Sequence, residues 1–408
     1  MTDIINQLAG LDTSELVALR ERRPDAVANA QLSFQALLEP ETPGTFSYEE
    51  RYAVAAFVTG ISQAGRAAQF YLDLLADEAD EQVLSAVQQA IAAGTTTGPS
   101  QGSVFTLFDA TSALGPRLAS ALDFAHLLTF HPKDASPAAV GHLDANGWSA
   151  DDIVSLSQLI SFLAFQQRVV HGISVLAGTV SAPATVNPRA EHASAADSVG
   201  LPDWEPTDNI LVPQVVKPAK FVNHSLGWEP WVPAMEKSDL AEEHLDALIR
   251  PERADMPYFR LLARDPAALK ARTLTDLDIF YNTEGGLARA ERELAATVAS
   301  RYNGCEYCAS VHQARAKEEG GDAAAIDRLL DEGISADLGS AQWNAIRDAA
   351  VALTSTPFEF TDGHITALRE VGLDDLSIID VINSSAFFNW ANRLMLTLGE
   401  PNVPKRFR

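Results

Sequence analysis

The sequence predicts an all-α protein built from two copies of one helical bundle. Alanine is abundant, apolar residues recur at intervals of three and four, and long alternating runs of valine, isoleucine and threonine are missing. With 408 residues, the chain exceeds the roughly 250 to 300 residues at which single cores stop growing, so more than one domain is expected. Its 47% hydrophobic and 21% charged residues allow each domain to bury a core.

The apolar periodicity predicts the helices in chain order. Their expected ranges are 14–23, 48–76, 81–93, 117–130, 138–146, 150–177, 240–249, 266–272, 274–281, 287–302, 305–319, 323–332, 340–353, 363–371 and 376–398.

Residues 180–235 interrupt this series. The stretch is rich in proline, which cannot continue a helix at this density, and it contains Trp204, Trp228 and Trp231. The tryptophans favour a connector anchored along the surface over a flexible spacer. We therefore expect a helical domain at 1–179, a proline-rich connector at 180–235 and a second helical domain at 236–408.

An internal repeat indicates that the two domains are homologous. A shift of 225 residues produces nine identities over 44 positions without a gap, and a shift of 241 matches Glu50-Arg51 with Glu291-Arg292. The first copy therefore carries 16 extra residues between these matches, which we place near 94–103. Arg168 and Arg393 occupy equivalent places on apolar helices; structural ion pairs between helices are expected there, with a role in a pocket as the alternative.

Charge and composition exclude several functional classes. The formal charge of −25 disfavours binding to nucleic acid or to an anionic membrane surface. No basic, apolar leader begins the chain, and no uninterrupted apolar stretch reaches the ~18 residues of a membrane helix. Two cysteines cannot make a disulfide framework and are typical of a reducing compartment. A cytoplasmic protein is predicted.

The two cysteines lie close to a histidine in the segment Asn303-Gly304-Cys305-Glu-Tyr-Cys308-Ala-Ser-Val-His312. Asn303-Gly304 is a helix stop, so a new helix is expected to begin near Cys305. Positions 305, 308 and 312 then share one helical face. A thiol in the first turn of a helix is stabilised as the thiolate by the helix dipole, and His312 is placed to exchange a proton with Cys308.

A carboxylate that orients the histidine would complete a proton relay. Glu291 and Glu293 lie on the preceding helix, with Glu284 just before it, and periodicity does not choose among them. Two other interpretations are weighed against the relay: the cysteines are inert core residues, or Cys305, Cys308, His312 and a glutamate bind zinc. Zinc is disfavoured because structural sites usually take ligands from two pairs and no second pair exists.

The stretch 287–315 resembles the alkylhydroperoxidase D-like group of the carboxymuconolactone decarboxylase superfamily. The pattern of that group is a glutamate, eleven residues, Cys-x-x-Cys, three residues and a histidine, and Glu293, Cys305, Cys308 and His312 match it at every position. Residues 387–393 also resemble the carboxy-terminal helix of the group. The resemblance covers 236–408 well, and 40–180 only in its scaffold.

The resemblance implies a cysteine peroxidase that acts on hydrogen peroxide or organic hydroperoxides without a cofactor or a metal. It implies that Cys308 is the peroxidatic thiolate and that Cys305 donates a proton and then resolves the sulfenic acid as a disulfide. His312 and Glu293 would form the proton relay, which favours Glu293 over Glu291. It further implies a reductant, either a protein dithiol or a lipoyl-type adaptor, and a homo-oligomer, either a dimer or a trimer.

The first copy lacks these chemical groups. The shift of 241 places Tyr52 opposite Glu293, Ala64 opposite Cys305, Ala67 opposite Cys308 and Tyr71 opposite His312. We therefore expect this copy to be architectural, with a separate activity in its own pocket as the alternative.

Three other functions compete with the peroxidase. The same dithiol would serve a thiol–disulfide oxidoreductase or a redox sensor, whereas a decarboxylase acting on a cyclic lactone would leave the dithiol unexplained.

Overall fold

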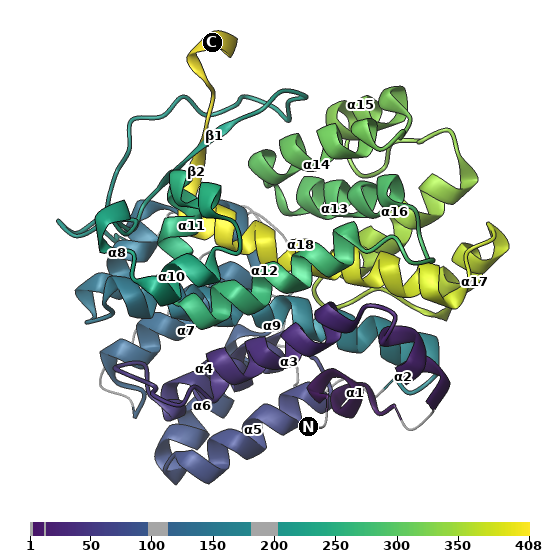
Figure 1. Ribbon diagram of the computed structural model, residues 1–408. Coiled ribbons are helices and arrows are strands. Elements are labelled where there is room, and N and C mark those ends of the chain that lie inside the picture. The colour runs from purple at the N-terminus through teal and green to yellow at the C-terminus, as the bar shows by residue number, and fades with distance from the viewer. Residues whose placement is uncertain (1–2, 12–13, 97–112, 181–202) are drawn as a thin grey trace.

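The computed structural model describes residues 3–11, 14–96, 113–180 and 203–408, and it confirms the all-α prediction. Within these residues the chain forms eighteen α-helices and one small antiparallel sheet (Figure 1). The sheet pairs β1 (Gly227–Pro230) with β2 (Gly399–Asn402), so that the connector contacts the end of the chain.

The first half contains nine α-helices among its described residues. They are α1 (Ile4–Ala9), α2 (Ser14–Arg20), α3 (Pro24–Leu38), α4 (Tyr48–Ile61), α5 (Arg66–Glu78), α6 (Glu81–Gly94), α7 (Gly115–Phe130), α8 (Pro137–Ala145) and α9 (Ala150–Ala177). Helices α1 and α3 were not predicted. The single helix predicted at 48–76 is wrong, because the chain turns between α4 and α5 through Gln63 and Gly65, both at positive φ.

The second half contains the remaining helices of the described chain. They are α10 (Glu242–Ala247), α11 (Pro257–Leu262), α12 (Pro266–Tyr281), α13 (Arg289–Asn303), α14 (Glu306–Glu318), α15 (Ala323–Glu332), α16 (Ala341–Thr354), α17 (Asp362–Glu370) and α18 (Asp375–Thr397). The two short helices predicted at 266–272 and 274–281 are one continuous helix, α12.

Helices α3 to α9 and helices α12 to α18 follow one another in the same order. Helix α13 begins 241 residues after α4, and α18 begins 225 residues after α9, which are the two shifts of the sequence repeat. Most of the segment 94–103, where we placed the extra residues, lies outside the described residues. A common origin of the two halves stays a prediction.

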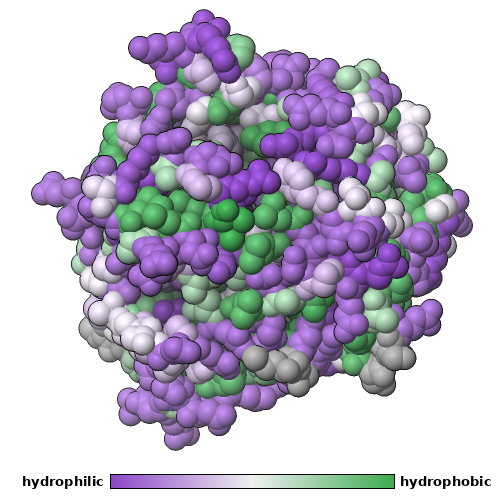
Figure 2. Space-filling model, viewed as in Figure 1, coloured by the Kyte–Doolittle hydropathy of each residue, from purple (hydrophilic) through white to green (hydrophobic). Residues whose placement is uncertain are grey.

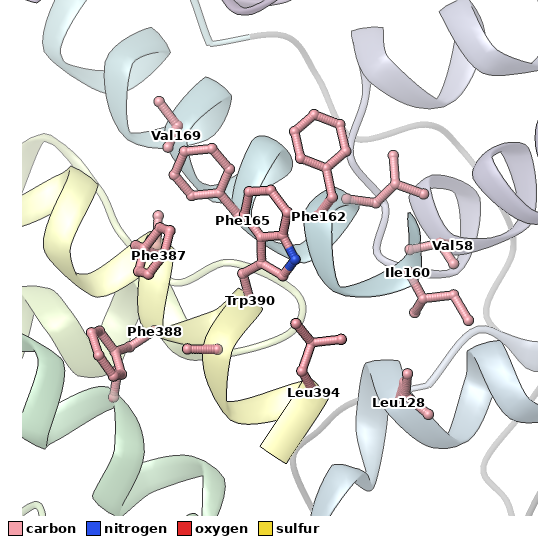
Figure 3. Packing of buried hydrophobic residues seen from close by; sticks show 14 of the residues in the cluster. Val58, Leu128, Ile160, Phe162, Phe165, Val169, Phe387, Phe388, Trp390 and Leu394 are labelled. Atoms are coloured by element: carbon pink, nitrogen blue, oxygen red, sulfur yellow. The ribbon is translucent and has the colours of Figure 1, made fainter. Parts of the chain in front are cut away.

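The two halves pack as one body around a continuous hydrophobic core. Helix α9 packs along α18 and α3 along α12, so helices at corresponding positions of the repeat face each other. Figure 3 shows the centre of this contact, where Phe162 and Phe165 of α9 meet Phe387 and Trp390 of α18. The rings of Phe162 and Trp390 lie edge to face with centroids 5.2 Å apart.

Two buried arginines connect the halves reciprocally. Arg168 donates to the carbonyl oxygen of Thr354 at 2.8 Å, and Arg393 donates to the carbonyl oxygen of Thr129 at 3.2 Å. Because Arg168 matches Arg393 and Thr129 matches Thr354 in the repeat, the contact has the self-complementary form of a two-fold interface. The predicted ion pairs are wrong for both arginines, because the guanidinium groups donate to carbonyl oxygens instead of carboxylates.

The described part of the connector is anchored by its tryptophans. Trp228 and Trp231 are buried, and the Trp228 indole donates to the carbonyl oxygen of Met395 at 2.9 Å. The Trp204 ring stacks on His142 with centroids 4.2 Å apart. The connector therefore lies against both halves.

Helix α9 is the one described helix that is long and apolar enough to cross a membrane. The protein buries 89% of its apolar window, so α9 is a helix of the protein core. Hydrophilic side chains cover most of the face in Figure 2, and a hydrophobic band crosses its middle over the region of α11 and α12.

Candidate active site

The sequence-predicted site residues lie at the junction of α13 and α14. Gly304 ends α13 in the left-handed conformation, with φ 78°, which glycine adopts at little cost. Cys305 is the N-cap residue of α14, and its N–H donates to the carbonyl oxygen of Ser300 at 2.9 Å. The expected helix start near Cys305 is confirmed, so Cys308 and His312 lie one turn apart on α14.

The turn is held against α18 by a buried amide. The Asn303 side chain donates to the side-chain oxygens of Asn389 at 3.2 Å and Asn392 at 3.0 Å. All three residues are buried. The first turn of α14 is therefore positioned by the core helix of the second half.

Glu293 and His312 form a close, buried pair. Glu293 Oε2 lies 2.5 Å from His312 Nδ1, and Arg289 donates to the other carboxylate oxygen at 3.3 Å. Burial alone would raise the pKa of Glu293, but His312 and Arg289 outweigh it and lower the pKa below its ordinary value. An ionised carboxylate only accepts hydrogen bonds, so His312 Nδ1 carries the hydrogen and Nε2 is left to exchange a proton.

Glu291 points away from the histidine. It accepts a hydrogen bond from the indole of Trp343 at 3.2 Å. Of the two glutamates of α13, only Glu293 is brought to His312, and among the described residues no hydrogen bond joins the third candidate, Glu284, to it.

Both cysteines are free thiols and both are buried, with 1% of Cys305 and 5% of Cys308 exposed. Burial raises the pKa of Cys305 well above its ordinary value, and the neighbouring Cys308 side chain raises it further. This desolvation opposes the stabilisation of a thiolate that the helix dipole would give Cys305. Cys305 is held as a protonated thiol.

A cavity of about 350 Å³ opens beside these residues. Glu293, Cys308 and His312 line it, whereas Cys305 lies behind Cys308 and is not part of its wall. Phe280 and Phe388 contribute apolar surface, and the Phe388 ring lies edge to face with His312, with centroids 4.1 Å apart. A small molecule in this cavity would meet Cys308 and His312 together.

Among the residues that the structure describes, no three His, Cys, Asp or Glu side chains gather as a metal site. The pairing of His312 with Glu293 instead uses the imidazole as a partner of a carboxylate.

The segment that contains these residues is similar to a known protein family. Residues 266–351 match the Carboxymuconolactone decarboxylase family, and this range includes Glu293, Cys305, Cys308 and His312. The second half contains a carboxymuconolactone decarboxylase domain. The resemblance noted in the sequence is confirmed for this domain.

One solved structure similar to the chain is that of a peroxidase-related protein from Silicibacter sp. TM1040. It is 26% identical over 44% of this chain and 95% of its own, with a TM-score of 0.36, which is too low for the likeness to support a conclusion about the overall structure. No curated protein matched the chain.

In the first half, the positions that match the site have a turn between two helices but no cysteine, histidine or glutamate. Ala64 and Ala67, which match the cysteines, line a separate cavity of about 550 Å³. Tyr71, which matches His312, is fully buried and donates to Gln166 Oε1 at 2.6 Å. Tyr52, which matches Glu293, is half-buried.

Several residues that line the cavity beside Cys308, or support it, were not predicted from the sequence. Arg289 lies one turn before Glu293, and that spacing on a helix is the signal that indicates the pair. Arg272 and Tyr258 reach the cavity from α12 and α11. No sequence pattern indicates them, because only the packing of α11 and α12 beside α18 brings them to Cys308.

Proposed function

We propose that the chain is a thiol-dependent peroxidase that reduces hydrogen peroxide or organic hydroperoxides. The observation that carries the proposal is the arrangement of three side chains around one cavity. Cys308 faces the cavity, and the buried pair of His312 and Glu293 lines the same wall. A nucleophile, a base and a group that orients the base are thus in place.

The first step consumes the peroxide. The Cys308 thiolate attacks one peroxide oxygen, an S–O bond forms, the O–O bond breaks, and Cys308 becomes a sulfenic acid. The leaving oxygen takes a proton and departs as water or an alcohol. The raised pKa of Cys305 keeps a proton on that sulfur, which suits it as the donor.

The second step forms a disulfide. The Cys305 sulfur attacks the sulfenic acid, an S–S bond forms, and the oxygen leaves as water. The Glu293–His312 pair moves the protons, because His312 Nε2 accepts one while the carboxylate stabilises the imidazolium. A dithiol reductant, either a protein dithiol or a lipoyl-type adaptor, then supplies two electrons to restore both thiols.

The test is a thiol titration against peroxide. We expect the reduced protein to lose both thiols for each peroxide consumed, and Cys308→Ser to abolish consumption. Ala67→Ser introduces the same side chain at the matching position of the first half and should keep the wild-type rate. Peroxide consumption by Cys308→Ser at the wild-type rate would overturn the proposal.

Burial of the dithiol favours a small substrate over a protein. Because at most 5% of either cysteine is exposed, a protein disulfide would have to enter the cavity to reach Cys308. If the protein reduces a protein disulfide faster than a peroxide, the oxidoreductase replaces the peroxidase. Oxidation that changes the assembly without turnover would instead indicate a redox sensor. The cytoplasmic location and the dimer or trimer stay predictions.

A further inference from the structure

Arg272 is a buried cation without a hydrogen-bond acceptor. Its side chain is 6% exposed, lines the cavity beside Cys308, and has a fully buried Nε that no acceptor contacts. Among the described residues it makes neither a hydrogen bond nor an ion pair; its guanidinium lies over the rings of Phe387 and Trp390 at 5.1 and 5.8 Å. The faces of aromatic rings attract the positive charge of the guanidinium, but they do not accept conventional hydrogen bonds from its N–H groups.

An unmatched buried guanidinium is costly. Arg168 and Arg393, each 2% exposed, donate to carbonyl oxygens, although Nε of Arg168 also lacks a partner. Leaving a buried donor without an acceptor costs about 1 to 3 kcal/mol, and more when the donor is charged. Arg272 differs from both because none of its nitrogens has an acceptor among the described residues.

A second polar group in the cavity wall also lacks a hydrogen-bond partner. The hydroxyl of Tyr258 is buried and has no hydrogen-bond partner among the described residues. Electrostatic interactions connect this hydroxyl with Arg272 and with Cys308. The Tyr258 ring lies edge to face against Trp228 of the connector, with centroids 5.4 Å apart, which holds it in the cavity wall.

The charges around the cavity favour an anion. Four arginines line it, at positions 250, 253, 272 and 315, against the acidic side chains of Glu252, Asp276 and Glu293. Glu293 is already engaged by His312 and Arg289. In a chain of net charge −25, this is a local excess of guanidinium groups.

The remaining wall is suited to an apolar body. Phe280, Phe387 and Phe388 line the cavity together with Met256 and Met395. Its volume of about 350 Å³ far exceeds the ~30 Å³ that one water molecule occupies in the liquid. Hydrogen peroxide would leave most of this space and both unmatched polar groups without a partner.

We propose that Arg272, together with the Tyr258 hydroxyl, binds the carboxylate of an organic hydroperoxide whose apolar body lies against the phenylalanines. The inference rests on the proposed peroxidase function and specifies its substrate class: an alkyl hydroperoxide with an aromatic or other apolar body that carries a carboxylate. A carboxylate accepts two hydrogen bonds from a guanidinium in one plane and retains capacity for a hydroxyl donor.

A matched pair of substrates tests the proposal: 4-carboxycumene hydroperoxide and its methyl ester, which differ at the carboxylate. We expect kcat/KM of the wild type to be about ten- to a hundredfold higher for the acid, the range of a charged hydrogen bond. Arg272→Met should bring this ratio close to one, mainly through KM, and Tyr258→Phe should lower it less. Arg369→Met, an exposed arginine on α17, should keep it.

Binding separates this inference from the peroxidase itself. 4-Isopropylbenzoate has the carboxylate and the ring but no peroxide, and calorimetry can measure its binding to the wild type and to Arg272→Met. Binding that Arg272→Met loses supports the anion site even if no peroxide is consumed. Turnover of acid and ester at equal rates, or equal binding to both proteins, overturns the anion site and leaves the peroxidase intact. If Arg272→Met does not fold, the Tyr258→Phe ratio decides in its place.

Discussion

The turn before α14 and the turn before α5 begin with the same backbone conformation and differ in chemistry. They diverge two residues later, where Gly65 has positive φ and the matching Glu306 is helical. Gly304 and Gln63, which match in the repeat, both adopt positive φ, at 78° and 55°. The N–H of Cys305 donates to Ser300, and the N–H of Ala64 donates to Thr59, at 2.9 and 3.0 Å. The scaffold therefore does not make the site: in the first half the same turn presents two methyl groups to a cavity.

The difference extends to the residues behind the turn. In the second half, His312 is paired with a buried carboxylate and faces a cavity, whereas in the first half Tyr71 is joined to Gln166 inside the core. The same helix face thus carries a histidine–carboxylate pair in one copy and a neutral hydrogen bond inside the core in the other. Substitutions at matched positions of the two halves test this contrast.

Substitution of the matched pair His312 and Tyr71 should separate chemistry from packing. We expect His312→Gln to lower kcat/KM for peroxide about 10²- to 10⁴-fold, because it removes the base. Tyr71→Phe should leave kcat/KM within twofold and lower stability by about 1 to 3 kcal/mol, because Gln166 loses its hydrogen bond. Peroxide kinetics and urea unfolding of both variants measure this. Equal loss of activity in the two would contradict the contrast.

The matched arginines Arg292 and Arg51 should differ in their effect on stability. Both donate to backbone carbonyls of the preceding loop and helix, but only Arg292 also lies against a carboxylate, Asp380, at 3.2 Å. We expect Arg292→Met to cost about 2 to 4 kcal/mol, because the carbonyl oxygens and Asp380 lose a charged donor while Arg23 still pairs with Asp380. Arg51→Met should cost about 1 to 3 kcal/mol. Their urea midpoints give the order, and a larger loss for Arg51→Met would contradict it.

Glu293 should make the stability of the second half depend on acid pH. Its pKa is lowered in the folded protein, so its contribution is full above the unfolded value, about 4.3, and disappears as pH falls through the folded value. We expect Glu293→Gln to be less stable by about 1.5 to 3 kcal/mol at pH 7 and to approach the wild type below about pH 4. Urea midpoints from pH 3 to 7 check this. Tyr52→Phe, at the matching position, should show no such trend in this range.

Exchange of the residues at the two turns should give the smallest effects. Gln63→Gly should stabilise the protein by less than about 1 kcal/mol. Glycine removes the strain of positive φ, but it also loses more backbone entropy on folding, which offsets part of the gain. Gly304→Ala should destabilise it by about 1 to 2 kcal/mol, since a Cβ there would also lie 2.4 Å from Cδ of Lys133. Melting temperatures of the two variants should move in opposite directions. Movement in the same direction would contradict the view that positive φ sets the stability effect at both positions.

The sequence predicted much of the fold and the composition of the site. Helical periodicity indicated most helices, and it failed where the deciding signal was local: α3 was overlooked, and the turn through Gln63 and Gly65 was read as helix. The spacing predicted that Cys305, Cys308 and His312 share one face of a helix. The structure has Cys308 and His312 one turn apart on α14, whereas Cys305 is the N-cap residue and lies outside the cavity wall. Periodicity left Glu291 and Glu293 open, because which residue of α13 meets α14 depends on how the two helices cross.

Most helices and the ionisable groups of the site follow from the amino-acid sequence, because helical periodicity and residue spacing are local properties of the chain. The environment of those groups depends on tertiary packing. Burial raised the pKa of Cys305 against the helix dipole, and the crossing of α13 and α14 joined Glu293 to His312. The packing of α11 and α12 beside α18 brought Arg272 and Tyr258 to the cavity. These effects depend on desolvation and on contacts between distant segments, and no local pattern of residues encodes either.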